Sequence, residues 1–227
     1  MKAMILAAGL GTRMRPLTDN CPKPLLPVAG KPLIQHLIEK LVAAGFQQIV
    51  INHAYLGHMI EETLGNGEQF GCELLYSAEV EPLETAGGII KALPLLTDNG
   101  ESSEPFLLVN GDVWVDWDFS DAQRNFDGLG YLFLVANPEF NPKGDFVLQR
   151  DGKIIDRQDS ETGNTFSGIS WLSSELFAGL EPGKRALAPI LRAAMADNQI
   201  HGELLEKQWI DVGTPERLRQ VESLISA

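Results

Sequence analysis

Two glycines, an arginine and a lysine follow the first apolar segment of the chain. The run from Leu6 to Thr18 contains Gly9, Gly11 and Arg13, and Lys23 stands further along between two prolines. Glycines at the end of a strand let backbone N–H groups approach a ligand closely and surround anionic oxygen atoms. A guanidinium and an ammonium group can then neutralise those oxygens. The segment therefore indicates a site for phosphate groups.

Two better-known phosphate motifs do not fit this segment. Met14 stands where a dinucleotide fingerprint needs its third glycine, and the chain contains no Gly-Lys-Ser or Gly-Lys-Thr. A tight turn with a solvated arginine would explain Gly-x-Gly-Thr-Arg if it stood alone. The Pro-Lys-Pro at 22–24 and the position after a strand favour a binding site instead.

A carboxylate stands at the end of another apolar segment. Asp112 closes Asn-Gly-Asp directly after Phe106–Val109. In open α/β sheets ligands bind at the carboxyl ends of the strands, although a single carboxylate there is often only a helix cap or a surface residue. Asp116 and Asp118 are weaker candidates, because they alternate with apolar residues as solvated edge positions do.

Two further loops combine polar residues with glycine. Residues 79–88 contain two adjacent glycines that would let a base lie against the backbone, and an ordinary loop before a helix is the alternative. Residues 137–146 frame an asparagine and Asp145 with proline and glycine. Such side chains could bind sugar hydroxyls, or they could simply form turns.

The run from Met4 to Pro32 closely resembles the signature of the sugar-1-phosphate nucleotidylyltransferases, and matching motifs recur as far as Leu218. The resemblance implies a Rossmann-like nucleotidyltransferase fold, with Arg13 and Lys23 as the catalytic residues, Arg13 on the triphosphate and Lys23 near the reacting α-phosphate. It implies a nucleotide site made of Ala8, Gly9, Gly11, Thr12, Arg13, Lys23, Glu79, Ala86 and Gly87. It implies a sugar-phosphate site made of Asn110, Asn137, Gly144, Asp145 and Gly168. It also implies that Asp112 and Asp211 hold a divalent cation, and Mg²⁺ suits two carboxylates completed by phosphate and water.

Within that family, residues 82–88 and 141–146 most resemble the N-acetylmuramate-1-phosphate uridylyltransferases. The implied reaction transfers UMP from UTP to N-acetylmuramic acid 1-phosphate, in peptidoglycan recycling. The alternatives are a mannose-1-phosphate guanylyltransferase, a glucose-1-phosphate thymidylyl- or uridylyltransferase, a phosphocholine cytidylyltransferase, or a non-catalytic nucleotide-sugar sensor. The presence of Arg13, Lys23, Asp112 and Asp211 argues against the sensor.

Two departures from the family pattern affect the substrates. Glu84 stands where many members have glycine, so the identity of the base is open. The Glu-Lys-Pro that precedes Phe-x-Gly in many relatives is missing, so the cation that would bind the acceptor phosphate is unassigned. Lys143, Arg150 and Arg157 are weak candidates for it.

The elements that must position these residues alternate between strand and helix in the first half of the chain. We predict strands at 3–8, 49–51, 73–76 and 106–109, helices at 32–44, 54–64 and 87–96, and a long loop at 9–31. This alternation predicts an α/β fold with a mainly parallel central sheet flanked by helices. In the second half we expect strands at 131–136 and 146–155, the latter folded into an antiparallel hairpin at Asp151-Gly152, and helices at 174–179, 185–198 and after Thr214.

Length and charge limit the class of protein. The 227 residues fit a single domain, with 1–112 mainly binding nucleotide and 113–227 mainly binding sugar phosphate. A net charge of −13 argues against nucleic acid or an anionic membrane as partner. Two cysteines and four histidines show no metal spacing, and two thiols fit a reducing cytoplasm. The N-terminus lacks a signal-peptide cleavage pattern, no segment could span a bilayer, and no C-terminal repeat extension follows, which leaves a monomer plausible.

Overall fold

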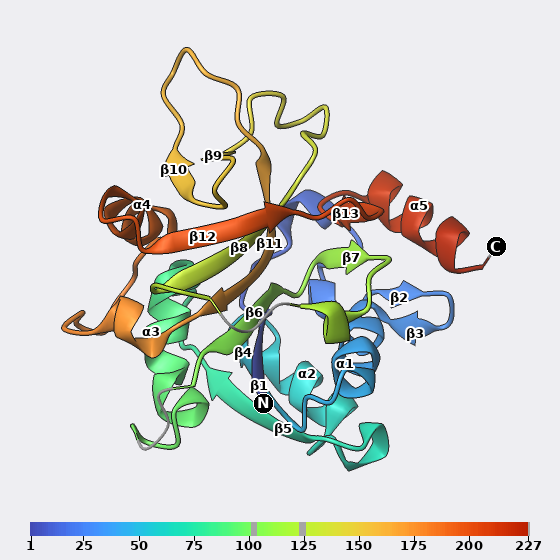
Figure 1. The fold of residues 1–227 in the computed structure, drawn as a ribbon. Helices are drawn as coiled ribbons and strands as arrows, with labels where there is room; N and C mark the ends of the chain where they lie inside the picture. The colour runs from blue at the N-terminus through green and yellow to red at the C-terminus, as the bar shows by residue number, and fades with distance from the viewer. Residues whose placement is uncertain (101–103, 123–125, 227) are drawn as a thin grey trace.

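The computed structural model describes residues 1–100, 104–122 and 126–226. A seven-stranded sheet forms its centre, in the order β12-β8-β11-β6-β1-β4-β5 (Figure 1). Its strands are β1 (Lys2–Leu6), β4 (Gln48–His53), β5 (Glu73–Ala78), β6 (Phe106–Asn110), β8 (Gly130–Val135), β11 (Thr165–Leu172) and β12 (Ile200–Leu204). All neighbours are parallel except β11, which runs antiparallel to both β6 and β8. The predicted mainly parallel α/β sheet is confirmed.

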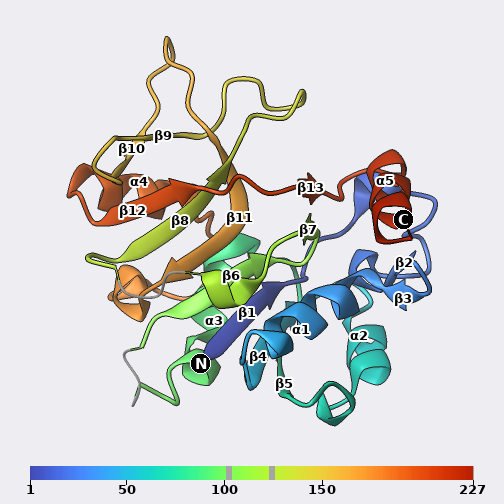
Figure 2. The same ribbon diagram turned by 45° about the vertical axis from the view of Figure 1, so that its right-hand side comes forward.

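Helices cover both faces of this sheet (Figures 1 and 2). Side chains alternate across β1, where Ala3 and Ile5 join one buried cluster and Met4 joins another. The first cluster packs under α1 (Leu33–Ala43) and α2 (Gly57–Leu64), and the second under α3 (Glu84–Leu96) and α4 (Ala188–Ala196). Burial on both faces explains why the strands read as nearly continuous apolar runs.

Three two-stranded ladders lie outside the main sheet. They pair β2 (Pro27–Val28) with β3 (Lys31–Pro32), β7 (Val113–Val115) with β13 (Trp209–Asp211), and β9 (Phe146–Leu148) with β10 (Ile154–Asp156). The β9–β10 hairpin confirms the predicted turn at Asp151-Gly152. Short 3₁₀ helices occur at 12–14, 23–25, 68–70, 119–121 and 174–177. The prediction of one continuous loop over 9–31 is wrong, because it contains two of these helices and part of the β2–β3 ladder.

The last helix is α5 (Pro215–Ile225), which packs through Leu218 and Val221 on a third, smaller cluster with Met14 and Leu33. Thr214 is its N-cap, since its Oγ1 accepts a hydrogen bond from the backbone N–H of Arg217 at 3.4 Å. This helix therefore begins where the sequence predicts it. Among the described residues, none of the helices is both long and apolar enough to cross a membrane.

Candidate active site

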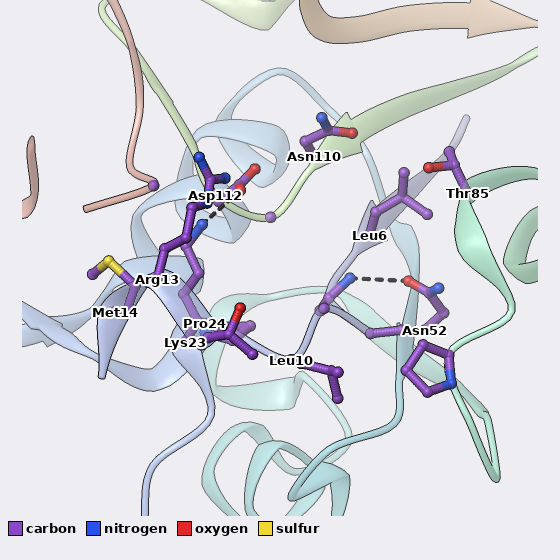
Figure 3. Close-up of a pocket in the computed structure, with 18 of the residues that line it drawn as sticks. Leu6, Leu10, Arg13, Met14, Lys23, Pro24, Asn52, Thr85, Asn110 and Asp112 are labelled. Atoms are coloured by element: carbon purple, nitrogen blue, oxygen red, sulfur yellow. Dashed lines mark hydrogen bonds and ion pairs between the residues drawn. The ribbon is translucent and has the colours of Figure 1, made fainter. Parts of the chain in front are cut away.

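A cleft of about 450 Å³ opens at the carboxyl ends of β1 and β6. That volume is within the usual range for small-molecule sites. The residues that line it are Leu6, Ala7, Ala8, Gly9, Leu10, Gly11, Thr12, Arg13, Met14, Lys23, Pro24, Asn52, Pro82, Glu84, Thr85, Asn110, Gly111, Asp112 and Gly213. Figure 3 shows Arg13, Lys23 and Asp112 grouped at one side of the cleft, with Asn52 and Thr85 at the other. The cleft therefore has a charged side and a polar side.

The predicted phosphate loop lines this cleft from Ala8 to Arg13. Gly11 has a φ of 63°, in the left-handed region, and a Cβ there would lie only 3.0 Å from Thr18 Cγ2. The Thr18 hydroxyl also donates a 2.8 Å hydrogen bond to the Gly11 carbonyl oxygen. Gly9 has open space around it, so a ligand can approach the backbone there. The loop is thus held in a conformation that glycine permits.

The cations and carboxylates of the site form two ion pairs. Lys23 Nζ lies 2.6 Å from Oδ2 of Asp112, and Arg217 Nη1 lies 3.0 Å from Oδ2 of Asp211. The two aspartates come from adjoining backbone segments, because the Val212 N–H donates to the Asp112 carbonyl oxygen at 2.8 Å. Asp112 lines the cleft, whereas Asp211 does not, although its carbonyl oxygen accepts a 2.8 Å hydrogen bond from the N–H of the lining residue Gly213. The predicted metal ligands are therefore neighbours, each with a cation as partner.

These two carboxylates suit a site for a hard divalent cation. In the described residues, no group of three or more His, Cys, Asp or Glu side chains could hold a metal ion. Asp112 and Asp211, which the family resemblance implies as metal ligands, would hold such a cation only together with water or phosphate oxygens. Magnesium commonly binds in this way, with one or two carboxylates and several waters.

The loop before α3 connects to the phosphate loop through a buried network. The carboxylate of Glu79, which is 6% exposed, accepts hydrogen bonds from Asn52 Nδ2 at 2.7 Å and from the Leu83 N–H at 2.9 Å. Asn52 Oδ1 in turn accepts from the Ala7 N–H at 2.9 Å. In this structure Glu79 does not line the cleft, but it fixes the side chain of Asn52, which does.

Two of the predicted nucleotide-binding residues pack inside the protein. The N–H groups of Ala86 and Gly87 donate to the carbonyl oxygen of Arg185 at 3.0 and 3.1 Å. A Cβ at Gly87 would lie 2.3 Å from the carbonyl oxygen of Gly183. Pro82, Glu84 and Thr85 line the cleft in their place. Glu84 has a φ of 61°, so the residue that departs from the family glycine adopts a glycine-like conformation.

Among the predicted sugar-phosphate residues, Asn110 lines the cleft, and Gly168 packs against Asn110. Gly168 has a φ of 79°, and a Cβ there would lie 2.5 Å from Asn110 Nδ2. Asp145 accepts hydrogen bonds from the Phe166 N–H at 2.8 Å and from Asn141 Nδ2 at 3.1 Å. Asn137 Nδ2 donates to the Gly163 carbonyl oxygen at 2.8 Å. Asn137, Gly144 and Asp145 lie outside the lining residues and brace the loop that carries them.

The three weak candidates for the acceptor cation also lie outside the lining residues. Lys143 and Arg150 are exposed. Arg157 Nη1 donates to the backbone carbonyl oxygens of Gln158 at 2.9 Å and Glu161 at 3.2 Å. The structure therefore brings none of the three to the charged side of the cleft.

The comparisons with known proteins agree with this cleft and fold. The family model described as Nucleotidyl transferase matches residues 2–143. The chain belongs to the nucleotidyl transferase family. An N-acetylmuramate alpha-1-phosphate uridylyltransferase from Neisseria meningitidis serogroup B is 49% identical over 234 residues, which cover 100% of this chain and 99% of the relative. A mannose-1-phosphate guanyltransferase from Gibberella zeae is 34% identical, over 95% of this chain and 61% of the relative.

Solved structures share the architecture of this nucleotidyl transferase. The crystal structure of HddC from Yersinia pseudotuberculosis matches with a TM-score of 0.79 at 23% identity, over 99% of each chain. At this identity the match shows the fold. The predicted Rossmann-like nucleotidyltransferase architecture, with a small antiparallel hairpin in the C-terminal half, is confirmed.

Sequence reasoning did not single out Asn52, which lines the cleft, or Arg217, which pairs with Asp211. Asn52 directly follows the predicted strand 49–51, so a polar residue at a strand end was a usable signal. Arg217 falls within the expected last helix, where an arginine reads as an ordinary solvated residue. Only the fold brings it beside Asp211.

Proposed function

We propose that this protein transfers UMP from UTP to N-acetylmuramic acid 1-phosphate, releasing pyrophosphate and forming UDP-N-acetylmuramic acid. The observation that carries the proposal is the 49% identity to an N-acetylmuramate alpha-1-phosphate uridylyltransferase over the full length of both chains. The cleft supports it, because its phosphate loop, Arg13 and Lys23 suit a nucleoside triphosphate. A role in peptidoglycan recycling and a cytoplasmic location follow from these substrates.

The reaction needs no covalent intermediate. A sugar phosphate, whose second pKa is near 6, is already ionised at neutral pH. One of its oxygens attacks the α-phosphorus of UTP, and the bond from that phosphorus to the pyrophosphate oxygen breaks. The enzyme has to hold two anions in line and neutralise them, which positioning and electrostatics achieve without a general base.

The residues divide these tasks by their place in the cleft. Arg13, on the exposed phosphate loop, binds the triphosphate. Lys23, whose side chain is 12% exposed, neutralises charge at the α-phosphate once an anion draws it from Asp112. Asp112 and Asp211 would hold Mg²⁺, which supplies Lewis-acid neutralisation of the phosphate oxygens. Residues 1–112 thus provide most of the nucleotide site, and 113–227 the acceptor site.

A guanylyltransferase is the second candidate, since a mannose-1-phosphate guanyltransferase is 34% identical over 95% of this chain. The test is a matrix of four nucleoside triphosphates against the 1-phosphates of N-acetylmuramic acid, N-acetylglucosamine, glucose and mannose, with release of pyrophosphate as the readout. We expect the highest kcat/KM for UTP with the muramic compound. A preference for GTP with mannose 1-phosphate would replace the first candidate with the second.

A further inference from the structure

Arg217 is an arginine of the first turn of α5 whose side chain points back to the active site. Its Nη1 lies 3.0 Å from Oδ2 of Asp211, and the side chain is 18% exposed. Its Cζ lies 4.3 Å from the centre of the Phe140 ring. One edge of the guanidinium thus contacts a predicted metal ligand and one face contacts the 137–145 loop.

Two guanidinium groups converge over Gly213. A Cβ built on this residue would lie 2.8 Å from Nη2 of Arg217 and 3.2 Å from Nη2 of Arg13. Two like charges this close are unfavourable unless anions lie between or beside them. In the described structure the carboxylate of Asp211 pairs with one of them, that of Arg217. Arg217 therefore belongs to the same charged centre as Arg13, approached from the acceptor loop.

We propose that Arg217 binds the 1-phosphate of the acceptor sugar. This inference rests on the proposed function, in which a second anion must enter beside the triphosphate. A protein of net charge −13 needs a local cation for that anion. Arg13 and Lys23 line the nucleotide side of the cleft, while Arg217 is joined to Phe140 on the predicted acceptor loop. Its planar fork of N–H donors matches phosphate oxygens.

The contact with the Phe140 ring restricts the orientation of the Arg217 guanidinium. The ring is 54% exposed and belongs to the loop that Asn137 and Asp145 brace against β11. An arginine on an aromatic face keeps its N–H edge free for an anion, and the stacking adds a cation–π contribution. The loop and the cation thus form one unit that an acceptor phosphate can meet in a defined direction.

The test is the steady-state kinetics of Arg217→Gln, with Arg219→Gln as the matched control. Arg219 lies on the same helix, but it is exposed and pairs with Glu216 at 3.2 Å. We expect Arg217→Gln to raise the KM for N-acetylmuramic acid 1-phosphate about 10- to 100-fold and to change the KM for UTP less than about twofold. Arg219→Gln should match the wild type. Arg217→Lys, which keeps the charge next to Asp211, should recover part of the loss.

A second acceptor substrate shows whether Arg217 binds the phosphate or the lactyl carboxylate. N-acetylmuramic acid 1-phosphate and its lactyl carboxamide carry the same phosphate but differ in the carboxylate. If Arg217 binds the phosphate, Arg217→Gln weakens both acceptors by the same factor. A loss confined to the carboxylate form would overturn the assignment, and so would an equal rise in the KM for UTP.

Failure of this inference is distinct from failure of the proposed function. If the wild-type enzyme prefers another sugar 1-phosphate, the proposed acceptor is wrong, and the same variants are measured with the preferred sugar, because the phosphate is common to both. If the wild type uses the muramic compound and Arg217→Gln keeps the normal acceptor KM, the inference about Arg217 is wrong.

Discussion

Lys23 Nζ lies 2.6 Å from Oδ2 of Asp112, so the predicted phosphate cation and the predicted metal ligand are partners of each other. Arg217 and Asp211 repeat the arrangement at 3.0 Å. Each pair neutralises one carboxylate within an acidic protein. We expect an incoming triphosphate to compete for the cations and a divalent metal to compete for the carboxylates. Binding of one ligand would then favour binding of the other, which is a coupling between two ligands.

The first prediction concerns the two aspartates. Asp112→Asn and Asp211→Asn each remove a negative charge that would hold the metal, so we expect kcat to fall about 100-fold or more. Asp116→Asn is the control, since this aspartate is exposed and lies close to Asp112 in the chain. Pyrophosphate release in steady state measures all three. Turnover that persists after exhaustive EDTA treatment would contradict a metal role.

The second prediction separates the roles of the two predicted phosphate-binding cations, Arg13 and Lys23. Lys23→Ala should lower kcat about 100-fold with a modest change in the KM for UTP, because its charge acts at the reacting phosphate. Arg13→Ala should lower kcat and also raise the KM for UTP about tenfold. Arg15→Ala is the control, because Arg15 is 63% exposed and pairs with Asp19. A folded Arg13 or Lys23 variant with wild-type kcat/KM would refute these roles.

Local sequence predicts the phosphate loop of the site, because Gly9, Gly11 and Arg13 follow one strand within a few residues. The structure accordingly places them together in the cleft. The proposed acceptor side of the site depends on contacts between distant segments, which spacing alone does not reveal. Arg217 meets Phe140 across 77 positions of the chain only because α5 packs beside the 137–145 loop.

The fold, like the site, is predicted from the sequence where its contacts are local and not where they join distant segments. Alternating strands and helices predict the parallel part of the sheet, where each βα unit is local in sequence. The antiparallel pairing of β11 with β6 and β8 joins segments that are distant in the sequence, so the local pattern does not predict it. The helix predicted at 185–198 begins only at Ala188. Arg185, just before this helix, accepts hydrogen bonds at its carbonyl oxygen from the N–H groups of Ala86 and Gly87 in α3. A local sequence pattern does not reveal such a contact.

The third prediction concerns the backbone at Glu84. At a φ of 61°, an L-residue with a side chain is strained and glycine is not. Glu84→Gly should therefore be more stable than Glu84→Ala by about 1–2 kcal/mol, a difference of roughly 2–8 °C in Tm for a chain of this size. Both variants lose the 3.8 Å contact with Lys184, so their comparison isolates the backbone. Equal Tm values would show that Glu84 is not strained.

The fourth prediction concerns Asp145, which fastens the acceptor loop to β11. Asp145→Ala removes the acceptor for both the Phe166 N–H and the Asn141 amide, so the loop loses its bracing. We expect the KM for the sugar phosphate to rise about tenfold while the KM for UTP stays within about twofold. Asp151→Ala, at the exposed turn between β9 and β10, is the control. An equal rise in both KM values would place Asp145 outside the acceptor site.

The last prediction concerns the link between Glu79 and the phosphate loop. The buried Glu79 carboxylate accepts from two donors, Asn52 Nδ2 and the Leu83 N–H, and Asn52 in turn accepts from the Ala7 N–H. A glutamine has the same shape but one acceptor oxygen, so one of the two donors would face an amide N–H₂.

Glu79→Gln should therefore break the hydrogen bond to either Asn52 or the Leu83 N–H in the loop before α3, while the core residues around position 79 stay the same. An unsatisfied buried donor costs about 1–3 kcal/mol, so we expect a lower Tm and a KM for UTP raised about 10-fold, with the KM for the acceptor unchanged. Asn52→Asp tests the same link from the other side, because it replaces the amide donor with a second carboxylate facing Glu79. Titration of each variant with UTP, followed by Tm, measures nucleotide affinity apart from turnover. If Glu79→Gln binds UTP as tightly as the wild type, the network does not position the nucleotide.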